Sequence, residues 1–194
     1  MSSIPYSHTT LLAQTAAISI SLATSGGILA ISNLINPLLD NSARSVSSSQ
    51  PDPSSTLPAV RFIFSRGSHI FPQAASIAGA AYFYLWYNTP TSVALGGSGS
   101  IAVLRDVLGL DVSRRVGYLV AGLMTVSIGP ITGLMLPAAN QRLRELADME
   151  AKGNGEKVDR EELKVLVSRF GYLNYARGVA MLVGGIVGVV TALS

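Results

Sequence analysis

The chain has 194 residues, of which 48% are hydrophobic and only 13% are charged, and its mean hydropathy of +0.42 exceeds that of most soluble domains of this length. The net charge of +3 does not indicate a nucleic-acid partner, because the basic residues are spread over connecting segments rather than over one folded face. The absence of cysteine excludes disulfides, thiolate nucleophiles and cysteine metal ligands. The composition therefore favours an integral membrane protein.

Four apolar segments are long enough to cross the hydrocarbon core of a bilayer, which takes roughly 20 residues. They lie at about 11–37, 67–88, 116–139 and 170–193, and only the last contains a charged residue, Arg177. The first segment lacks the basic flank and the small-residue cleavage site of a signal peptide, so we interpret it as a span. The sequence predicts an all-α fold, an integral membrane four-helix bundle that forms a single membrane domain over residues 1–194.

The connecting segments differ in character. Serine and proline dominate residues 40–60 and predict a flexible surface loop. Residues 141–169 are rich in charge and predict a charged helical arm, a cytosolic hairpin with its turn at Gly153. Asp159 can cap the second helix of this hairpin, and the apolar spacing that follows predicts that this helix continues into the fourth span.

The distribution of Lys and Arg predicts the orientation of the spans. Ten of these residues lie in the first and third connecting segments, and three lie in the second. Short segments rich in positive charge stay in the cytosol, so both termini are expected on the non-cytosolic side.

Small residues four positions apart predict close contacts between helices in every span. The Gly129-Pro130 pair in addition predicts a kink in the third span. The four pairs of small residues are Gly26 and Ala30, Ala75 and Gly79, Gly129 and Gly133, and Gly184 and Gly188.

In this orientation all four spans bring polar side chains to the cytosolic end of the bundle. Polar and ionisable groups inside a membrane are costly, and they usually face a bundle interior or a water-filled cavity that serves a site. His69 is the only residue of the group that titrates near neutral pH. The group consists of Asn33 and Asn36, His69 and Gln73, Asn140, and Asn174 and Arg177.

Structural roles for these residues stay open at this point. Arg177 can extend to the lipid headgroups or cap the carbonyls of the third span, and His69 can be a structural residue near the interface. The asparagines, taken singly, can serve as hydrogen bonds between helices. No metal site is expected, because His8 and His69 fall at opposite ends and the spans contain no carboxylate.

Two stretches that contain Asn140, Asn174 and Arg177 resemble motifs of the anthrone oxygenase family. The members of this family are small four-helix membrane proteins of fungal aromatic polyketide pathways. "LPAANQRL" resembles the family's Pro-x-x-Asn-x-x-Leu at the end of the third helix, and "RFGYLNYARG" resembles the aromatic-x-x-Leu-Asn-x-x-Arg-Gly that opens the fourth. Phe170 stands where tryptophan is frequent in the family. The stretch "SGGILAISNLINPLL" and the spacing of the four spans also fit.

The resemblance implies oxidation of an anthrone, a tricyclic aromatic ketone, to an anthraquinone in an endomembrane such as the endoplasmic reticulum. O₂ is then the co-substrate, and no cofactor is expected. The expected partners are the aromatic polyketide and the lipid bilayer, with a homodimer or contacts to pathway enzymes also possible. The site residues and roles expected under this hypothesis are His69 as base, Arg177 as electrostatic stabiliser, Asn174 and Asn140 as positioning groups, and Asn33, Asn36, Gln73 and Phe170 as substrate-binding residues.

Two other functions remain open from the sequence. The protein can be a membrane adaptor without catalytic activity, which docks a soluble biosynthetic enzyme through the 141–169 arm. It can also be a small transporter for an aromatic product, although that function needs a polar path through the membrane, and the polar residues gather at one end only.

Overall fold

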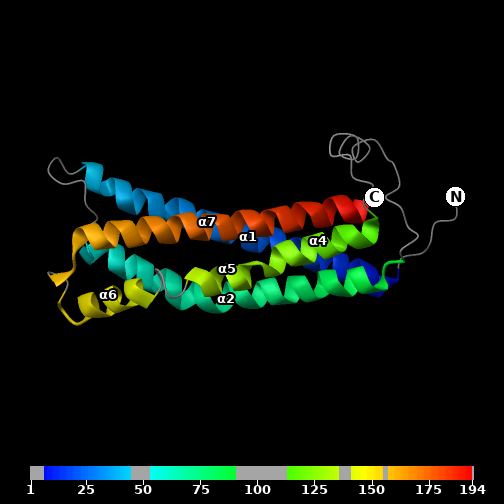
Figure 1. Ribbon diagram of the computed structural model, residues 1–194, viewed down its shortest axis with the longest axis horizontal. Helices are drawn as coiled ribbons and strands as arrows, with labels where there is room; N and C mark the ends of the chain where they lie inside the picture. The colour runs from blue at the N-terminus through cyan, green and yellow to red at the C-terminus, as the bar shows by residue number, and fades with distance from the viewer. Residues whose placement is uncertain (1–6, 45–52, 91–112, 136–140, 155–156, 194) are drawn as a thin grey trace. The chain divides into compact units, whose positions relative to one another are not determined.

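The computed structural model describes residues 7–44, 53–90, 113–135, 141–154 and 157–193. These residues form an all-α structure, without a β-sheet in the described part of the chain (Figure 1). The six helices are α1 His8–Arg44, α2 Pro53–Asn88, α4 Arg114–Val126, α5 Ile128–Met135, α6 Gln141–Ala151 and α7 Arg160–Leu193. The prediction of an all-helical fold is confirmed.

Three of the described helical segments are long and apolar enough to cross a membrane: His8–Asn33, Arg114–Gly133 and Arg160–Leu193. They correspond to the first, third and fourth predicted spans. The second predicted span, 67–88, is helical within α2 but is not among these three segments. Polar His69 and Gln73 and the aromatic run at Tyr82–Tyr87 lower the hydropathy of this segment, so its membrane crossing stays a prediction.

The residues group into two compact units, to both of which α1, α2 and α7 contribute. Unit 1 comprises Met1–Ser25, Gln73–Ile128 and Ala180–Ser194. Its apolar core is formed by Ala17, Tyr82, Leu85, Tyr118 and Ala121, all of them buried. Polar contacts also join the helices of this unit, because the Gln14 amide donates to the Tyr118 hydroxyl over 2.6 Å.

Glycines on α7 allow the helices of unit 1 to approach each other closely. A Cβ atom added at Gly184 would lie 2.7 Å from the Thr125 hydroxyl and 3.0 Å from the Ala121 carbonyl oxygen. At Gly188 an added Cβ atom would collide with the ring of Tyr82, which has no exposed surface. The predicted contact at this pair of small residues is confirmed.

The other predicted pairs of small residues differ from one another. An added Cβ atom at Gly79 would collide with Val126, and Ala75 is buried, so this pair also lies in a helix contact. By contrast, a Cβ atom at Gly26, Gly129 or Gly133 would have no neighbour within 4 Å among the described residues. Small-residue spacing alone therefore did not distinguish the packed helix faces from the open ones.

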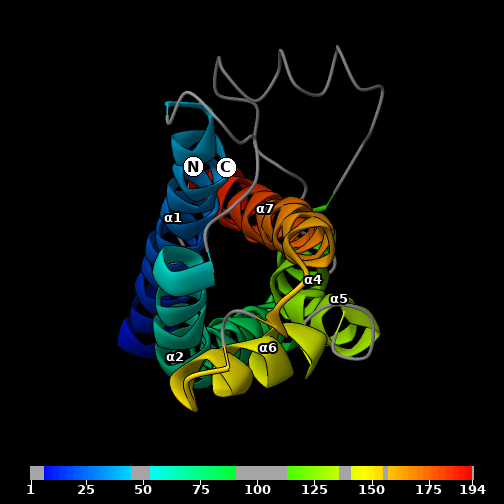
Figure 2. The same cartoon turned by 90° about the vertical axis from the view of Figure 1, so that its left-hand side faces the viewer.

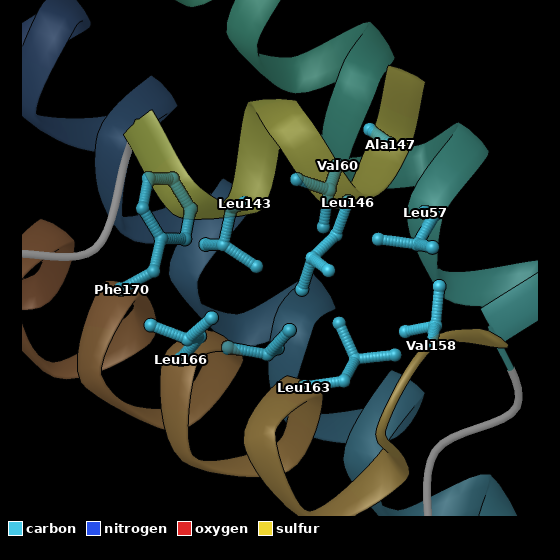
Figure 3. Close-up of a cluster of buried hydrophobic side chains, with 10 residues drawn as sticks. Leu57, Val60, Leu143, Leu146, Ala147, Val158, Leu163, Leu166 and Phe170 are labelled. Atoms are coloured by element: carbon cyan, nitrogen blue, oxygen red, sulfur yellow. The ribbon is translucent and has the colours of Figure 1, made fainter. Parts of the chain in front are cut away.

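Unit 2 comprises Gly26–Pro72 and Gly129–Val179, and its core lies between α2, α6 and α7. Figure 2 shows α6 beside the first half of α2 and the first turns of α7, and Figure 3 shows the apolar side chains of these helices pointing toward one another. The cluster contains Leu57, Val60, Leu143, Leu146, Ala147, Val158, Leu163, Leu166, Val167 and Phe170.

Both predicted helices of the arm are present, as α6 and the first turns of α7, and they are joined by a turn and an ion pair; the cytosolic location of the arm stays a prediction. Gly153 has a φ of 78°, in the left-handed region that glycine adopts without strain, and it ends α6. The Asp159 carboxylate accepts from the backbone N–H of Glu161 over 2.9 Å, so it caps α7 as predicted. Arg142 on α6 donates to both carboxylate oxygens of Glu162 on α7, over 2.7 and 3.1 Å.

The hydrogen bonds that Arg142 donates to Glu162 and Glu145 raise its pKa, so that this exposed guanidinium is charged at every physiological pH. Exposed ion pairs contribute little to stability because water screens them. The buried apolar cluster therefore carries most of the stabilisation of the arm.

The flexible loop predicted over 40–60 is wrong at both of its ends. Helix α1 continues to Arg44, and α2 begins at Pro53, in the first-turn position where proline is favoured. Leu57 and Val60 are 0% and 1% exposed in the cluster with α6 and α7. Burial of such a side chain is worth about 1.5–3 kcal/mol, so the two together offset the cost of the serines and of Pro58 within this part of the helix.

The third predicted span is interrupted, as the Gly129-Pro130 pair predicted. Helix α4 ends at Val126 and α5 begins at Ile128, with a turn at Ser127 between them. Pro130 cannot donate to the carbonyl of Val126 four residues earlier, and its ring clashes with that carbonyl. The interruption therefore falls three to four residues before the proline.

The glycine contacts predict a difference between two Gly→Ala variants. Alanine at Gly188 must displace the buried Tyr82 ring, and we expect a net destabilisation of about 1–3 kcal/mol even though alanine favours the helix. Gly26→Ala is the matched control, because the added methyl group meets open space. Thermal unfolding in detergent should give a lower Tm for Gly188→Ala only. Equal Tm values would contradict the close contact.

Candidate functional site

The side chain of Asn174 joins α7 to α1 within unit 2. It is 3% exposed, and its amide nitrogen donates to the carbonyl of Ile28 over 3.1 Å and to the hydroxyl of Ser32 over 2.9 Å. The Ser32 hydroxyl donates in turn to the Ile28 carbonyl over 2.9 Å. These bonds fix the orientation of the amide, so the Asn174 oxygen points away from α1.

Arg177 lies one helical turn after Asn174 and uses that oxygen. Its Nη2 donates to the Asn174 Oδ1 over 2.6 Å, and its Nη1 donates to the Thr132 hydroxyl on α5 over 3.1 Å. The Arg177 Nε is buried and has no hydrogen-bond partner among the described residues. The guanidinium is therefore held by two neutral oxygens, with donor capacity left over.

Close contact between α7 and α1 explains why this network forms where it does. A Cβ atom at Gly178 would lie 2.7 Å from the side chain of Leu29 and 3.2 Å from that of Ile28. A side chain at this position would force Leu29 to move, and one turn earlier the short Asn174 side chain reaches the α1 backbone. The "NYARG" stretch thus combines a close helix contact, a buried amide and a cation in five residues.

The electrostatics of the site are those of an uncompensated cation. No described carboxylate lies within ion-pair distance of Arg177, whose only polar partners are the two neutral side chains. Burying a charge without a counter-charge is costly, and more so in a membrane-length helix. Chemically, such a cation can bind an anion or stabilise negative charge that develops on an oxygen atom.

The other sequence-predicted site residues are not in this network. Asn33 and His69 are exposed, and neither is hydrogen-bonded to Asn174 or Arg177. Gln73 is exposed and belongs to unit 1. Phe170 is 2% exposed and packs in the apolar cluster with α6.

Two further predicted residues have no described side chain. Asn140 lies outside the described residues, and Asn36 lies in α1 where its side chain is outside the described part. The roles assigned to all these residues stay predictions.

Sequence reasoning missed two members of the network, Ser32 and Thr132. Ser32 directly precedes Asn33, and one residue along a helix turns the side chain by about 100°, so choosing the larger amide selected the wrong helix face. The buried positions Ser21, Ser25, Ile28 and Ser32 follow a spacing of four, three and four, which was the available signal. Thr132 follows Pro130 by two residues, and nothing in its local sequence distinguishes it.

The described residues offer little for a metal ion, since no group of three or more His, Asp or Glu side chains comes together among them. The expectation of a reaction without cofactor is untested by this observation and stays a prediction.

The fold and this site define a class: helical proteins with three described segments apolar enough to cross a membrane and a half-buried arginine held by neutral side chains. The sequence profile of the anthrone oxygenase family matches residues 60–187, and the chain belongs to this family. The matched region includes Thr132, Asn174 and Arg177, whereas α1 precedes it. The chain matches no curated protein and no solved structure.

The network predicts that the same substitution, Asn→Leu, lowers the free energy of unfolding by different amounts at two positions. Asn174→Leu removes three hydrogen bonds and leaves the Arg177 Nη2 and the Ser32 hydroxyl each without one partner, which should cost about 1–3 kcal/mol. Asn33→Leu changes an exposed side chain and should leave stability nearly unchanged. Thermal unfolding of both variants in detergent measures this difference, and a Tm loss of similar size in both would contradict the assigned network.

Proposed function

We propose that the protein is a membrane-bound oxygenase that converts an anthrone to an anthraquinone with O₂. Membership of the anthrone oxygenase family supports this choice of reaction. The single structural observation that supports it is the half-buried Arg177 guanidinium, which is held by Asn174 and Thr132 and has no ion-pair partner among the described residues. A half-buried cation with donors to spare suits a reaction that passes through an anion.

The reaction needs only a proton acceptor and O₂. Loss of a proton from the central methylene of an anthrone gives an aromatic enolate, which is rich in electrons. This anion passes one electron to O₂, and the resulting radical and superoxide combine to form a carbon–oxygen bond. The peroxide takes up a proton, and loss of the remaining C–H proton with cleavage of the O–O bond gives the quinone carbonyl and one molecule of water. The methylene is oxidised by four electrons, and one O₂ is reduced.

In this proposal Arg177 stabilises the enolate oxygen and then the peroxide, while Asn174 and Thr132 hold the guanidinium in place. A gain of negative charge near a preoriented cation in an apolar setting is stabilised far more than in water. Since the enolate supplies the electrons, no cofactor is required by this scheme. The membrane setting brings both reactants together, because anthrones and O₂ are apolar and concentrate in lipid.

The alternative function, a membrane adaptor, requires a surface on the 141–169 arm that can bind a soluble enzyme. The apolar face of α6 is already buried against α2 and α7, so a docked enzyme would have to bind the exposed charged face. Under that function, reversal of exposed charges on α6 such as Arg144 and Asp148 would abolish product formation in cells, while Arg177 substitutions that fold would not.

Catalysis predicts that Arg177→Gln lowers quinone formation. Removing a preoriented donor to a developing oxyanion costs about 10²–10³-fold in turnover, and we expect a loss in that range. The measurement is O₂ uptake and quinone formation by protein purified in detergent, with emodin anthrone as trial substrate and the spontaneous rate subtracted. Arg169→Gln is the control, because Arg169 is exposed and two turns away on the same helix. A folded wild-type protein that gives only the spontaneous rate would refute the enzymatic function with this substrate.

The base role of His69 has its own test. General-base catalysis contributes typically 10²-fold or more, so if His69 is the base, His69→Ala lowers kcat by at least that factor at neutral pH. Ile70→Ala, at the next position of the same helix and 58% exposed, serves as the control. A loss of less than tenfold removes His69 from this role and leaves the role of Arg177 unaffected.

A further inference from the structure

Several N–H donors of Arg177 are used by no described residue. A guanidinium carries five N–H donors, and two of them are used, by Thr132 and Asn174. Three remain, and one of them is at Nε, an atom that is fully buried and has no partner among the described residues. Buried polar groups are nearly always hydrogen-bonded, so an orphan of this kind leaves room for a partner that the described residues do not supply.

We propose that these free donors bind aryl oxide anions, meaning ionised phenols and enolates, and that the site prefers the anions to their neutral forms. The choice of aryl oxides rests on the proposed function. The preference for an anion rests on Arg177 itself, whose positive charge is met only by neutral oxygens in the described structure.

The surroundings favour a weakly hydrated anion over a small inorganic one. Ile28 and Leu29 pack against Gly178 beside the site, and Asn174 is 3% exposed. Chloride or phosphate would lose a strongly bound water shell on entering such a place. An aryl oxide spreads its charge over the ring and brings apolar surface of its own, so it loses less hydration and gains from burial.

The described neighbours of Arg177 do not change their own charge near neutral pH, so they do not cause the preference for the anionic over the neutral ligand. Its polar contacts come from α5 through Thr132 and from α7 through Asn174, with Ser32 and the Ile28 carbonyl of α1 behind Asn174. None of these groups ionises near neutral pH, and no hydrogen bond or ion pair from α2 or α6 to Arg177 occurs among the described residues. The charge state of the ligand therefore decides binding.

Hydroxylated anthraquinones are aryl oxides as well once they ionise. The same site then binds the ionised product, and product inhibition rises with pH as the phenol of the product loses its proton. The neutral and the ionised forms of such quinones differ in colour, so the charge state of the bound quinone can be read from its absorption spectrum.

The test uses 2-hydroxyanthraquinone, which resists further oxidation, bound to the full-length protein in non-ionic detergent. A cation close by favours the anion, so we expect the pKa of the bound dye to lie about 1–3 below its value in protein-free micelles. Arg177→Gln should abolish this difference, and Arg169→Gln should keep it. An unchanged dye pKa with wild-type protein, or an equal decrease with Arg177→Gln, would overturn the proposal.

Two further measurements test the proposal if the first variant does not fold or if the site binds inorganic anions. If Arg177→Gln does not fold, Arg177→Lys keeps the charge but lacks the guanidinium donors, and we expect it to bind the anion at least tenfold more weakly; equal binding would overturn the assignment to those donors. Replacing sodium gluconate by sodium chloride should leave the dye pKa unchanged, and its reversal by millimolar chloride would make this an inorganic anion site instead. A decreased dye pKa without anthrone oxidation would refute the proposed function and leave the anion site standing.

Discussion

The hydrogen bonds of Asn174 decide what α7 can do in unit 2. One amide group connects α7 to the backbone of α1 and, through its oxygen, holds Arg177. Neither task is independent of the other, because the nitrogen must face α1 for the oxygen to face the guanidinium. The close approach at Gly178 favours both, since a side chain there would press against Leu29 and Ile28 of α1. Helix packing and the charge of the site are thus coupled through a single residue.

The cost of an unpaired group in an apolar environment explains the chemistry of the site. An arginine that met a carboxylate here would be satisfied and inert, whereas one that meets only an amide and a hydroxyl keeps most of its electrostatic potential. Such an arrangement spends stability on a charge that no neighbour neutralises, which is common where a protein has to stabilise charge in a ligand.

The sequence predicted the helices and part of the network, and the failures have physical causes. Asn174 and Arg177 stand out because a polar group in a membrane-length helix is rare. Ser32 was passed over for Asn33 because the larger amide was given more weight than the helical spacing of the serines, Ser21, Ser25 and Ser32. The loop over 40–60 was misassigned since its composition is that of a loop, while tertiary contacts of Leu57 and Val60 decide its structure. The pairs of small residues failed for a similar reason: spacing shows that helices are able to approach, not which partner is present.

The apolar cluster around α6 has a consequence for the order of biosynthesis. Its members come from three stretches of chain that leave the ribosome at different times, first Leu57 and Val60, then the side chains of α6, and last Leu163–Phe170. When α6 emerges, α2 can cover one flank of its apolar face, but the other flank stays uncovered until α7 has been made. Between these two moments the nascent chain presents an unfinished apolar surface on the arm, which is the stage at which a chaperone would bind it most tightly.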